Sequence, residues 1–390
     1  MHSFRIFLLI LAGLFQGLLL HAQYTLRISV SVKPVMGEAD SLFIAGSFNR
    51  WNPHQEGYAL VKKGDQWEIE LAGLQENDCK FKFTRGSWEK AETDSLGNDI
   101  ADRLISLNAD SSVQFSIEGW KDQLKPVLRQ HTASPQVHIL DTAFFIPQLN
   151  RKRRITVYLP DGYLHGKQRY PVLYMNDGQN LFDEYMALYG EWGVDECIDS
   201  VTKNKTRPAI VVGIDNSPYR MTEYSPYPFR DYGEPEGDAY VDFIARTLKP
   251  FIDKKYRTLH DRGHTTIAGS SLGGLIAYYA LLKYPDVFGN AGIFSPSFWV
   301  AMPPLKSLTS DAAGKVNGKV FFYMGEAEGE SYVNDLCEMT DLLGEYSGAI
   351  VYRVIDPAGK HEEKSWRKWF AEFYTWVMGD GFNNQVRIIE

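Results

Sequence analysis

Residues 265–275 read Thr-Thr-Ile-Ala-Gly-Ser-Ser-Leu-Gly-Gly-Leu, a β-branched segment that runs through a glycine-flanked serine into an apolar, helix-like segment. Gly269, Ser271 and Gly273 fit the pattern G-x-S-x-G, in which a sharp strand-to-helix turn holds a serine hydroxyl clear of a sheet. Glycine is needed on either side because a Cβ there would collide with neighbouring backbone. The alternative is an ordinary Gly/Ser turn, but the flanking strand and helix favour a nucleophile at Ser271, not at Ser270.

Segments of strand and helix character alternate on both sides of this turn. We expect strands at 154–159, 172–175, 209–214, 265–268, 291–294, 319–324 and 350–355. Helices are clearest at 240–256, 275–284, 333–346 and 365–378. Such alternation is typical of an α/β domain with a mainly parallel sheet, which we place at residues 137–380.

A nucleophilic serine needs a base, and the order of residues along the chain selects one. In the α/β-hydrolase fold the nucleophile is followed by an acid and then by a histidine, and His361 is the only histidine after Ser271. It lies in the loop 357–363, between the last predicted strand and the last predicted helix. There it would take the serine proton and return it to the leaving alcohol. The alternative is a solvated loop histidine beside two glutamates.

The acid that orients this histidine is expected in the loop after the preceding strand, which ends near Met324. Three glutamates follow in that loop. A carboxylate in this role fixes the imidazole tautomer and stabilises the imidazolium. Spacing alone does not choose among Glu326, Glu328 and Glu330, and Asp335 is assigned to the following helix.

The tetrahedral intermediate needs two backbone N–H donors for its oxyanion. One is expected from Leu272, the residue after the nucleophile, and the other from the loop after an early strand. That loop reads Asn-Asp-Gly-Gln-Asn at 176–180, where Gly178 permits an unusual backbone turn. Gln179 is the predicted second donor, the alternative being a loop that only ends the strand.

Residues 24–119 have a different pattern, with short alternating segments separated by Gly, Asn, Asp and Pro. Strands are predicted at 26–32, 41–45, 66–71 and 80–84. We expect a small antiparallel, immunoglobulin-like β-sandwich without a catalytic constellation. Residues 120–136, which contain two prolines and no clear period, are predicted to be a linker.

Residues 1–22 are predicted to be a secretory signal peptide. Basic residues come before an apolar run at 6–20, and Ala22 stands at the expected cleavage point. The alternative, an uncleaved membrane anchor, is weaker because this run falls short of the roughly 20 residues that a bilayer core requires. We therefore expect an exported protein, periplasmic or extracellular, with no stable membrane span in the mature chain.

Composition and charge narrow the class of protein. Hydrophobic side chains make up 44% of the 390 residues, and the formal net charge is −8. An acidic surface repels phosphate backbones, so nucleic acid is not an expected partner. Cys79, Cys197 and Cys337 are too few for a disulfide framework and are interpreted as small buried side chains, with a Cys197–Cys337 bridge left unsupported. No H-E-x-x-H motif or Cys/His cluster indicates a metal.

Six motifs resemble the putative-esterase family, which includes esterase D, enterochelin esterases and microbial feruloyl esterases. They lie, in the family's order, at 170–183, 212–216, 248–258, the Ser271 turn, 295–299 and 359–366. The resemblance implies an α/β-hydrolase that cleaves esters through an acyl-enzyme without a cofactor. In relatives the acid stands three residues after the glycine that ends the penultimate strand, here Gly325, which implies Glu328. Asn176 departs from the histidine that many members have before Asp-Gly.

Two segments of the predicted sandwich resemble starch- and glycogen-binding modules. They read Ala-Gly-Ser-Phe-Asn-Arg-Trp-Asn-Pro at 45–53 and Phe-Lys-Phe-Thr-Arg-Gly-Ser-Trp at 81–88. The resemblance implies that Trp51, Trp88 and Lys82 line a sugar site. An indole can stack on the apolar face of a pyranose while a lysine donates hydrogen bonds to hydroxyl groups. The alternatives are a spacer module and a core position for Trp51.

Aromatic residues in loops at the expected carboxyl edge of the sheet are candidates for holding an acyl group or a sugar, with core packing as the alternative. They are Trp192, Tyr227, Trp299, Phe298 and Tyr224, the last three being the preferred substrate contacts. Export and the sugar-module resemblance favour a feruloyl or acetyl ester of a polysaccharide. An enterobactin-type siderophore trilactone is the competing substrate, and a glucan-binding protein with an inactive hydrolase fold is the competing class.

Overall fold

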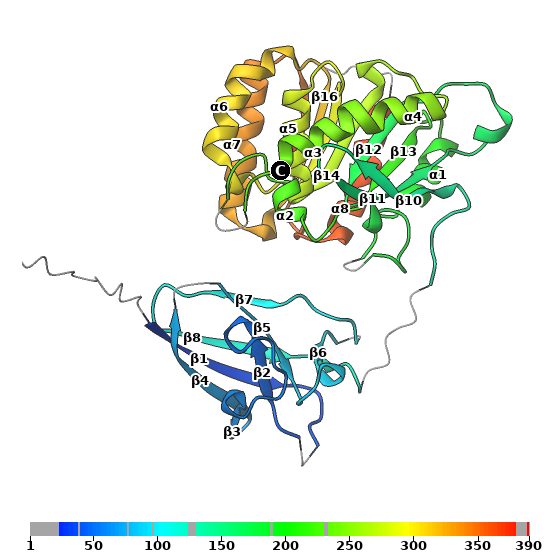
Figure 1. Ribbon diagram of the computed structural model, residues 1–390. Helices are drawn as coiled ribbons and strands as arrows, with labels where there is room; N and C mark the ends of the chain where they lie inside the picture. The colour runs from blue at the N-terminus through cyan, green and yellow to red at the C-terminus, as the bar shows by residue number, and fades with distance from the viewer. Residues whose placement is uncertain are drawn as a thin grey trace, which may run out of the picture. The chain divides into compact units, whose positions relative to one another are not determined.

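The computed structural model contains two compact units, divided between residues 129 and 130. Figure 1 shows a β-rich first unit and a second unit in which helices surround a sheet. Residues 1–22, the predicted signal peptide, lie outside the described residues. The structure describes residues 23–37, 40–75, 78–95, 97–123, 130–187, 190–229, 233–379 and 388–389. No helix within these ranges is long and apolar enough to cross a bilayer.

The first unit is built from short strands. They are β1 (Gln23–Val32), β2 (Phe43–Gly46), β3 (Val61–Lys63), β4 (Gln66–Gln75), β5 (Asp78–Thr84), β6 (Glu92–Thr93), β7 (Arg103–Ser106), β8 (Ser111–Ile117) and β9 (Gly119–Trp120). One sheet has the order β3-β4-β1-β8, a second has the order β2-β5-β7, and β6 pairs with β9. The pairing is antiparallel except between β1 and β8, which run parallel. These strands are distant in the chain, so no hairpin turn forces them to be antiparallel.

Alternate side chains of these strands face a shared core. Leu26 and Ile28 of β1 are buried with Phe81 and Phe83 of β5, at the two-residue period of a half-buried strand. Trp120 at the end of β9 is fully buried in the same core. The first unit therefore extends past residue 119.

Within the described residues, a nine-stranded sheet forms the centre of the second unit. Its strands are β10 (Val137–Ile146), β11 (Arg151–Tyr158), β12 (Val172–Asn176), β13 (Ile210–Ile214), β14 (Thr265–Ser270), β15 (Asn290–Phe294), β16 (Lys319–Gly325), β17 (Ile350–Asp356) and β18 (Ile388–Ile389). Their order is β10-β11-β13-β12-β14-β15-β16-β17-β18. Only the pairings of β10 with β11 and of β11 with β13 are antiparallel. The mainly parallel α/β architecture is thus present, and it brings the carboxyl ends of β12, β14, β15 and β16 to one edge.

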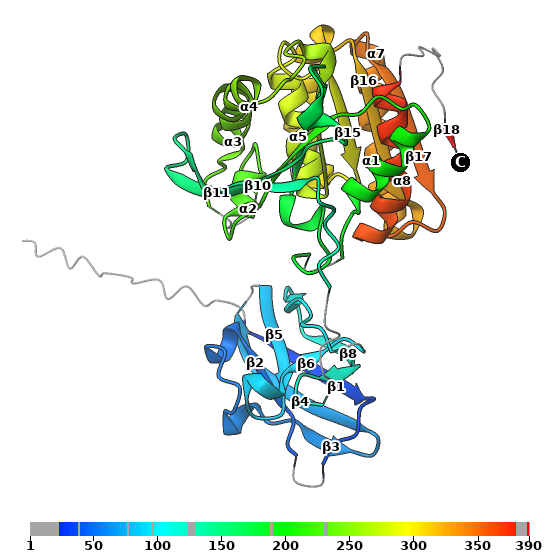
Figure 2. The same cartoon turned by 90° about the vertical axis from the view of Figure 1, so that its right-hand side faces the viewer.

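Helices cover both faces of this sheet (Figure 2). They are α1 (Val194–Lys203), α2 (Arg220–Glu223), α3 (Gly237–Phe243), α4 (Lys249–Lys255), α5 (Leu272–Lys283), α6 (Met302–Ala312), α7 (Glu330–Tyr346) and α8 (Glu363–Met378). A π-helical segment, Ile244–Leu248, joins α3 to α4, so the predicted helix at 240–256 is one irregular run. Side chains of α1 and α8 belong to one hydrophobic core, and those of α3, α5 and α7 belong to another.

The predicted linker, 120–136, is too long at both ends. Trp120 belongs to the core of the first unit. The Ser134 N–H donates to Asp195 Oδ2 (2.7 Å), which attaches this part of the chain to α1 in the second unit. Trp120 is therefore part of the first unit and Ser134 part of the second. The segment that belongs to neither unit is shorter than predicted.

The expectation of three buried cysteines is wrong for two of them. Cys79 is buried, whereas Cys197 and Cys337 are half-buried on helices α1 and α7, and no disulfide joins them. Burial raises the pKa of the Cys197 thiol to about 11. This side chain is therefore a protonated thiol at neutral pH.

Candidate active site

Ser271 occupies a strained turn between β14 and α5. Its φ is 58° and its ψ is −126°, a conformation that residues with a side chain rarely adopt. A Cβ at Gly269 would lie 2.5 Å from the Gly273 carbonyl oxygen, so glycine is required beneath the turn. The Ser271 N–H donates to the Phe294 carbonyl at the end of β15 (3.0 Å). Strand, helix and neighbouring strand together hold the serine at the carboxyl edge of the sheet.

The Ser271 hydroxyl lies 3.4 Å from the Ser297 hydroxyl, its only hydrogen-bond partner in the described part of the chain. The Ser297 N–H also donates to the Ser271 carbonyl (3.1 Å). No hydrogen bond joins Ser271 to His361 in this conformation. Such bonds are often long without substrate and tighten when a substrate binds.

His361 Nδ1 lies 2.6 Å from Glu328 Oε2. The Glu328 side chain is 4% exposed, whereas the His361 side chain is 47% exposed. A carboxylate acceptor at Nδ1 keeps the proton of the neutral ring there and leaves Nε2 as an acceptor. Glu326 and Glu330 are exposed, and of the three glutamates it is Glu328 that pairs with the histidine.

A buried network fixes the Glu328 carboxylate. Its Oε1 accepts from the Ser295 hydroxyl (2.6 Å) and from the Gly325 N–H (2.9 Å). The Trp366 indole N–H donates to the Ser295 oxygen (2.9 Å), and the Trp366 ring meets the His361 ring edge-on with centroids 5.2 Å apart. These contacts hold acid and imidazole in one mutual orientation. Neither Ser295 nor Trp366 is predicted in this role, although both lie in segments that resemble the family.

The predicted oxyanion donors lie on segments that touch. Leu272 opens α5, and Gln179 lies in the 3₁₀ turn Gly178–Asn180 after β12. Within the described ranges, neither amide N–H donates to a protein acceptor. Asn176 Nδ2 donates to the Gly273 carbonyl (2.9 Å), which ties the end of β12 to the first turn of α5.

The backbone strain in this loop lies one residue before the position expected for it. Asp177 has the positive φ, 56°, and not Gly178. Glycine is needed at 178 for close approach, because a Cβ there would lie 2.7 Å from the Gly213 carbonyl carbon on β13. The loop is therefore pressed against the neighbouring strand.

Asp177 is held by a network that the sequence does not predict. Arg220 donates from Nε to Oδ1 (2.8 Å) and from Nη2 to Oδ2 (2.9 Å), a bidentate geometry. The Asp177 N–H donates to the Tyr224 hydroxyl (3.3 Å), and the Tyr240 hydroxyl donates to Asn176 Oδ1 (2.9 Å). Burial raises the pKa of both tyrosines above the usual value, so both remain neutral hydroxyls. The network positions the loop that contains the Gln179 amide.

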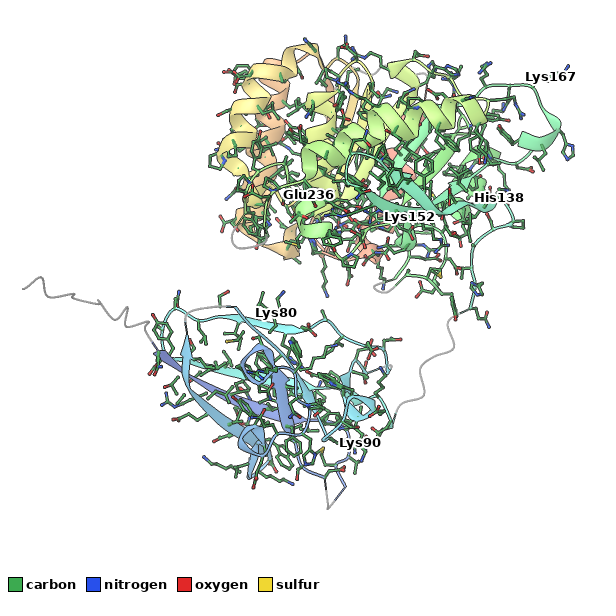
Figure 3. The ribbon with its side chains drawn as sticks, in the orientation of Figure 1. Lys80, Lys90, His138, Lys152, Lys167 and Glu236 are labelled. Atoms are coloured by element: carbon green, nitrogen blue, oxygen red, sulfur yellow. The ribbon has the colours of Figure 1, made fainter. Side chains whose placement is uncertain are left out.

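Helix α2, which supplies Arg220, is anchored to the sheet through Glu223. This fully buried carboxylate accepts from Arg153 Nη2 (2.7 and 2.8 Å) and from Arg151 Nη1 (2.9 Å) of β11. Arg151 also donates to Glu236 (2.6 Å), which is labelled in Figure 3. The positive charges of the two arginines balance the negative charges of the two glutamates. A buried cluster of charges requires such a balance.

Two of the three preferred substrate contacts are buried, which corrects the expectation for them. Phe298 and Tyr224 have no exposed surface. The Phe298 ring packs against Tyr278 with centroids 5.3 Å apart, because its apolar side chain turns into the core under the loop. Trp192 is also buried, against Trp366. None of these side chains offers surface to a ligand in this conformation.

Trp299 is the preferred contact that remains exposed, at 44%. Its ring lies 5.3 Å from that of Phe229 and 6.5 Å from that of Tyr332, centroid to centroid. We call these three side chains the aromatic surface. Trp299 stands two residues after the serine that contacts Ser271, and Tyr332 lies in the first turn of α7, four residues after Glu328.

Two of the predicted sugar-binding residues of the first unit lie side by side. The Trp51 and Trp88 rings lie 6.3 Å apart at an angle of 41°. Trp88 is exposed and Trp51 is half-buried, so Trp51 is not a buried core residue. Lys82 pairs with Asp102 (3.7 Å). The two tryptophans thus form one aromatic pair with an exposed ring.

Comparison with known proteins gives consistent results. The pattern of the putative esterase family matches residues 146–374. The uncharacterized protein YbbA of Bacillus subtilis is 30% identical over 185 residues, 45% of this chain and 69% of that protein. The endo-1,4-beta-xylanase/feruloyl esterase of Xylanibacter ruminicola is 27% identical over 236 residues, which are 59% of this chain but only 30% of that protein. The structure of the enterobactin esterase FES from Shigella flexneri, in the presence of enterobactin, is similar with a TM-score of 0.53 at 17% identity, covering 86% of this chain and 87% of that chain.

Proposed function

The chain belongs to the putative esterase family, and on that premise we propose that it hydrolyses carboxylic esters with Ser271 as nucleophile, His361 as base and Glu328 as orienting acid. The observation that carries the proposal is the buried Glu328 carboxylate 2.6 Å from His361 Nδ1. Burying a carboxylate costs free energy. A functional role for His361 explains this cost, whereas a solvated loop histidine without a function does not. The strained turn at Ser271 supplies the second part of the site.

In the first half of the proposed reaction, Ser271 Oγ attacks the ester carbonyl carbon while His361 Nε2 removes the hydroxyl proton. The carbonyl electron pair moves onto oxygen, where the N–H groups of Leu272 and Gln179 stabilise the negative charge. The intermediate then collapses, the bond to the alcohol oxygen breaks, and this oxygen takes the proton from His361. The product is an acyl ester of Ser271.

In the second half, water attacks the acyl-enzyme, His361 takes the water proton, and the same proton returns to Ser271 Oγ as the acid leaves. Glu328 stabilises the imidazolium formed in each half without taking its proton. No hydrogen bond joins Ser271 to His361 in this conformation, and we expect this bond to form when an ester binds, since catalytic hydrogen bonds often tighten only in the substrate complex.

The proposed substrate is a feruloyl or acetyl ester of a polysaccharide. The aromatic surface supports this, since two of its rings, Trp299 and Tyr332, are exposed and a flat ring can stack on an aryl group or on a sugar face. The Trp51–Trp88 pair supports it from the first unit, and the similarity to a protein named a feruloyl esterase is in line with it. We also propose export, to the periplasm or outside the cell, on the predicted signal peptide at 1–22.

A siderophore ester is the second candidate substrate. The similarity to the Shigella flexneri enterobactin esterase covers 86% of the chain, more than the second unit alone supplies. A catechol ring would stack on the same aromatic surface. The candidate from another class, a glucan-binding protein with an inactive hydrolase fold, is disfavoured by the ordered pair of His361 and Glu328.

The test is a comparison of hydrolysis rates on methyl ferulate, p-nitrophenyl acetate and ferric and iron-free enterobactin, with Ser271→Ala as the blank. Ser270→Ala, at the buried neighbouring serine, is the matched control. We expect the Ser271 variant to lose about 10⁶-fold in kcat and the Ser270 variant to remain active. Faster hydrolysis of ferulate or acetate supports the polysaccharide substrate, and faster hydrolysis of enterobactin supports the siderophore. Wild-type rates in Ser271→Ala would refute Ser271 as the nucleophile. No hydrolysis of any ester by the wild type would refute the proposed esterase activity.

A further inference from the structure

Glu363 is a buried acid beside the proposed active site that the mechanism does not use. It opens α8, two residues after His361, and is 7% exposed. Asn180 Nδ2 donates to its Oε1 (3.2 Å), the one side-chain donor to this carboxyl group in the described part of the chain. Burying a carboxyl group costs free energy. We therefore expect Glu363 to have a function beside the proposed active site.

Two arginines of the surrounding elements are already engaged by other acids. Arg220 forms its bidentate pair with Asp177. Arg367, one turn further along α8, donates to Glu191 (3.3 Å). Among the described residues no ion pair is formed by Glu363 itself. Burial without an ion pair therefore favours the neutral carboxylic acid, against the start of α8 and the residue's own N–H, which favour the charged form.

The charges that face Glu363 act in both directions. Burial is the largest cause and raises the pKa of Glu363 to about 7. The Asp177 carboxylate adds to this rise, while a hydrogen bond from the backbone N–H of Glu363 itself, His361 and Arg220 oppose it. The side chain thus changes its protonation state near neutral pH.

The side-chain oxygen of Asn180 lacks a hydrogen-bond donor, and a neutral carboxylic acid could supply one. Its Oδ1 is buried and has no hydrogen-bond partner within the described ranges. A protonated carboxyl group can donate its O–H to an amide oxygen while it accepts from the amide N–H, which satisfies both groups. Asn180 is the last residue of the turn Gly178–Asn180, directly after Gln179. The pair therefore connects the start of α8 to the loop of the proposed oxyanion donor.

We propose that Glu363 is a positioning residue, which as a neutral acid binds Asn180 and so holds the Gln179 amide in place for the oxyanion. The inference rests on the proposed esterase function. Ionisation removes the O–H donor and places a negative charge beside the loop, which opposes the developing oxyanion. Hydrolysis should therefore slow as Glu363 loses its proton.

The proposal predicts one feature of the dependence of kcat on pH. The rate falls with rising pH as Glu363 ionises, near pH 7. Glu363→Gln keeps one donor and one acceptor toward Asn180 and cannot ionise, so its rate should reach a plateau and not fall.

The kinetic experiment compares kcat on p-nitrophenyl acetate from about pH 5 to pH 9 in the full-length protein, after subtraction of a Ser271→Ala blank. In the wild type we expect kcat at pH 9 to lie about tenfold or more below its maximum, and in Glu363→Gln to stay within about twofold of the plateau. Glu363→Ala should be slower at every pH because it lacks both hydrogen bonds. Glu362→Gln, at the exposed neighbour, is the matched control and should keep the wild-type profile. An alkaline fall that survives in Glu363→Gln would overturn the inference.

A second measurement does not need activity. A folded-state pKa near 7, above the ordinary glutamate value, means that the folded protein keeps the proton longer than the unfolded chain, so stability falls as pH rises through this window. The gap in unfolding midpoint between Glu363→Gln and wild type should widen from about pH 4.5 to pH 7 and then stay constant. A gap that is the same at every pH would overturn the inference. A wild type without esterase activity would refute the proposed function but leave this measurement readable.

Discussion

His361 is held more firmly than its exposure suggests. Its Nδ1 faces a carboxylate that is itself fixed by Ser295 and Gly325, and its ring rests against Trp366. Such contacts fix the tautomer and leave Nε2 as the atom that can accept a proton. The serine, by comparison, has only Ser297 as a described hydroxyl partner, so the reactive geometry requires the Ser271 hydroxyl to turn from Ser297 toward the histidine.

Glu328→Gln tests this arrangement at the scale of one residue. Glutamine keeps the shape of the side chain but removes the charge and can present an N–H to Nδ1, which favours the wrong tautomer. We expect kcat on p-nitrophenyl acetate to fall by about 10³- to 10⁴-fold. Glu326→Gln, at an exposed glutamate two residues away, is the matched control and should stay within about twofold, as surface substitutions usually do. Equal rates in the two variants would contradict the role of Glu328.

Ser271 and His361 could be proposed from the sequence because a motif and an order along the chain need no knowledge of packing. Spacing could not choose among the three glutamates of one loop, and the proposal of Glu328 depends on the family resemblance and on its contact with the histidine. Phe298 was misplaced because an aromatic residue in a loop has the same sequence signal whether it turns outward or, as here, into the core. Glu363 had no predicted role, because the sequence does not reveal that the packing of α8 buries it.

At the scale of elements, the turn between β14 and α5 depends on glycine for close approach. At Gly269 a Cβ would lie 2.5 Å from a backbone oxygen, an atom that cannot move aside without shifting the helix. We expect Gly269→Ala to destabilise the protein by about 1–3 kcal/mol and to lower activity, because the turn that carries Ser271 must shift.

Gly344→Ala is the matched control for this prediction. Gly344 lies on the exposed side of α7, and a Cβ there would have no neighbour within 4 Å. Because Gly344 lies in the last turn of α7, alanine there should stabilise the protein by at most about 0.5–1 kcal/mol relative to glycine. Unfolding in denaturant measures both changes, and a Gly269 variant as stable as the wild type would show that the turn tolerates a side chain.

The central strands and the helices α5, α7 and α8 were predictable from their periods, whereas β10 and α6 were not. β10 pairs with β11 with register shifts at Ile139/Asp141 and Asp141/Phe144, so its side chains do not alternate cleanly. α6 begins with Met-Pro-Pro, and prolines that act as a helix start in the structure read as helix breakers in the sequence. In both cases neighbouring elements, not local propensity, decide the conformation.

At the scale of the whole molecule, the change from alternating strands to a strand–helix series predicts two parts. The edges of the predicted linker were wrong because Trp120 and Ser134 are attached by tertiary contacts that no local pattern reveals. The division of labour proposed here gives chemistry to the second unit and sugar recognition to the first.

The double variant Trp51→Ala/Trp88→Ala tests that division in the full-length protein. If the two rings stack on a glucan, affinity for soluble starch or glycogen should fall by about tenfold or more, while kcat on p-nitrophenyl acetate stays unchanged. Leu104→Ala, at an exposed apolar residue of β7 in the same unit, is the control and should change neither quantity. Glucan binding that survives loss of both tryptophans would place any sugar site elsewhere.

The central claim, that Ser271 is the nucleophile, is tested most directly by covalent labelling with a fluorophosphonate followed by peptide mapping. An activated serine displaces fluoride and forms a stable phosphonyl ester at Oγ. We predict one adduct per chain, located at Ser271, with loss of esterase activity in proportion to labelling, no adduct in Ser271→Ala and normal labelling in Ser270→Ala. An adduct on a different residue, or complete inactivation with Ser271 unmodified, would contradict the proposed site.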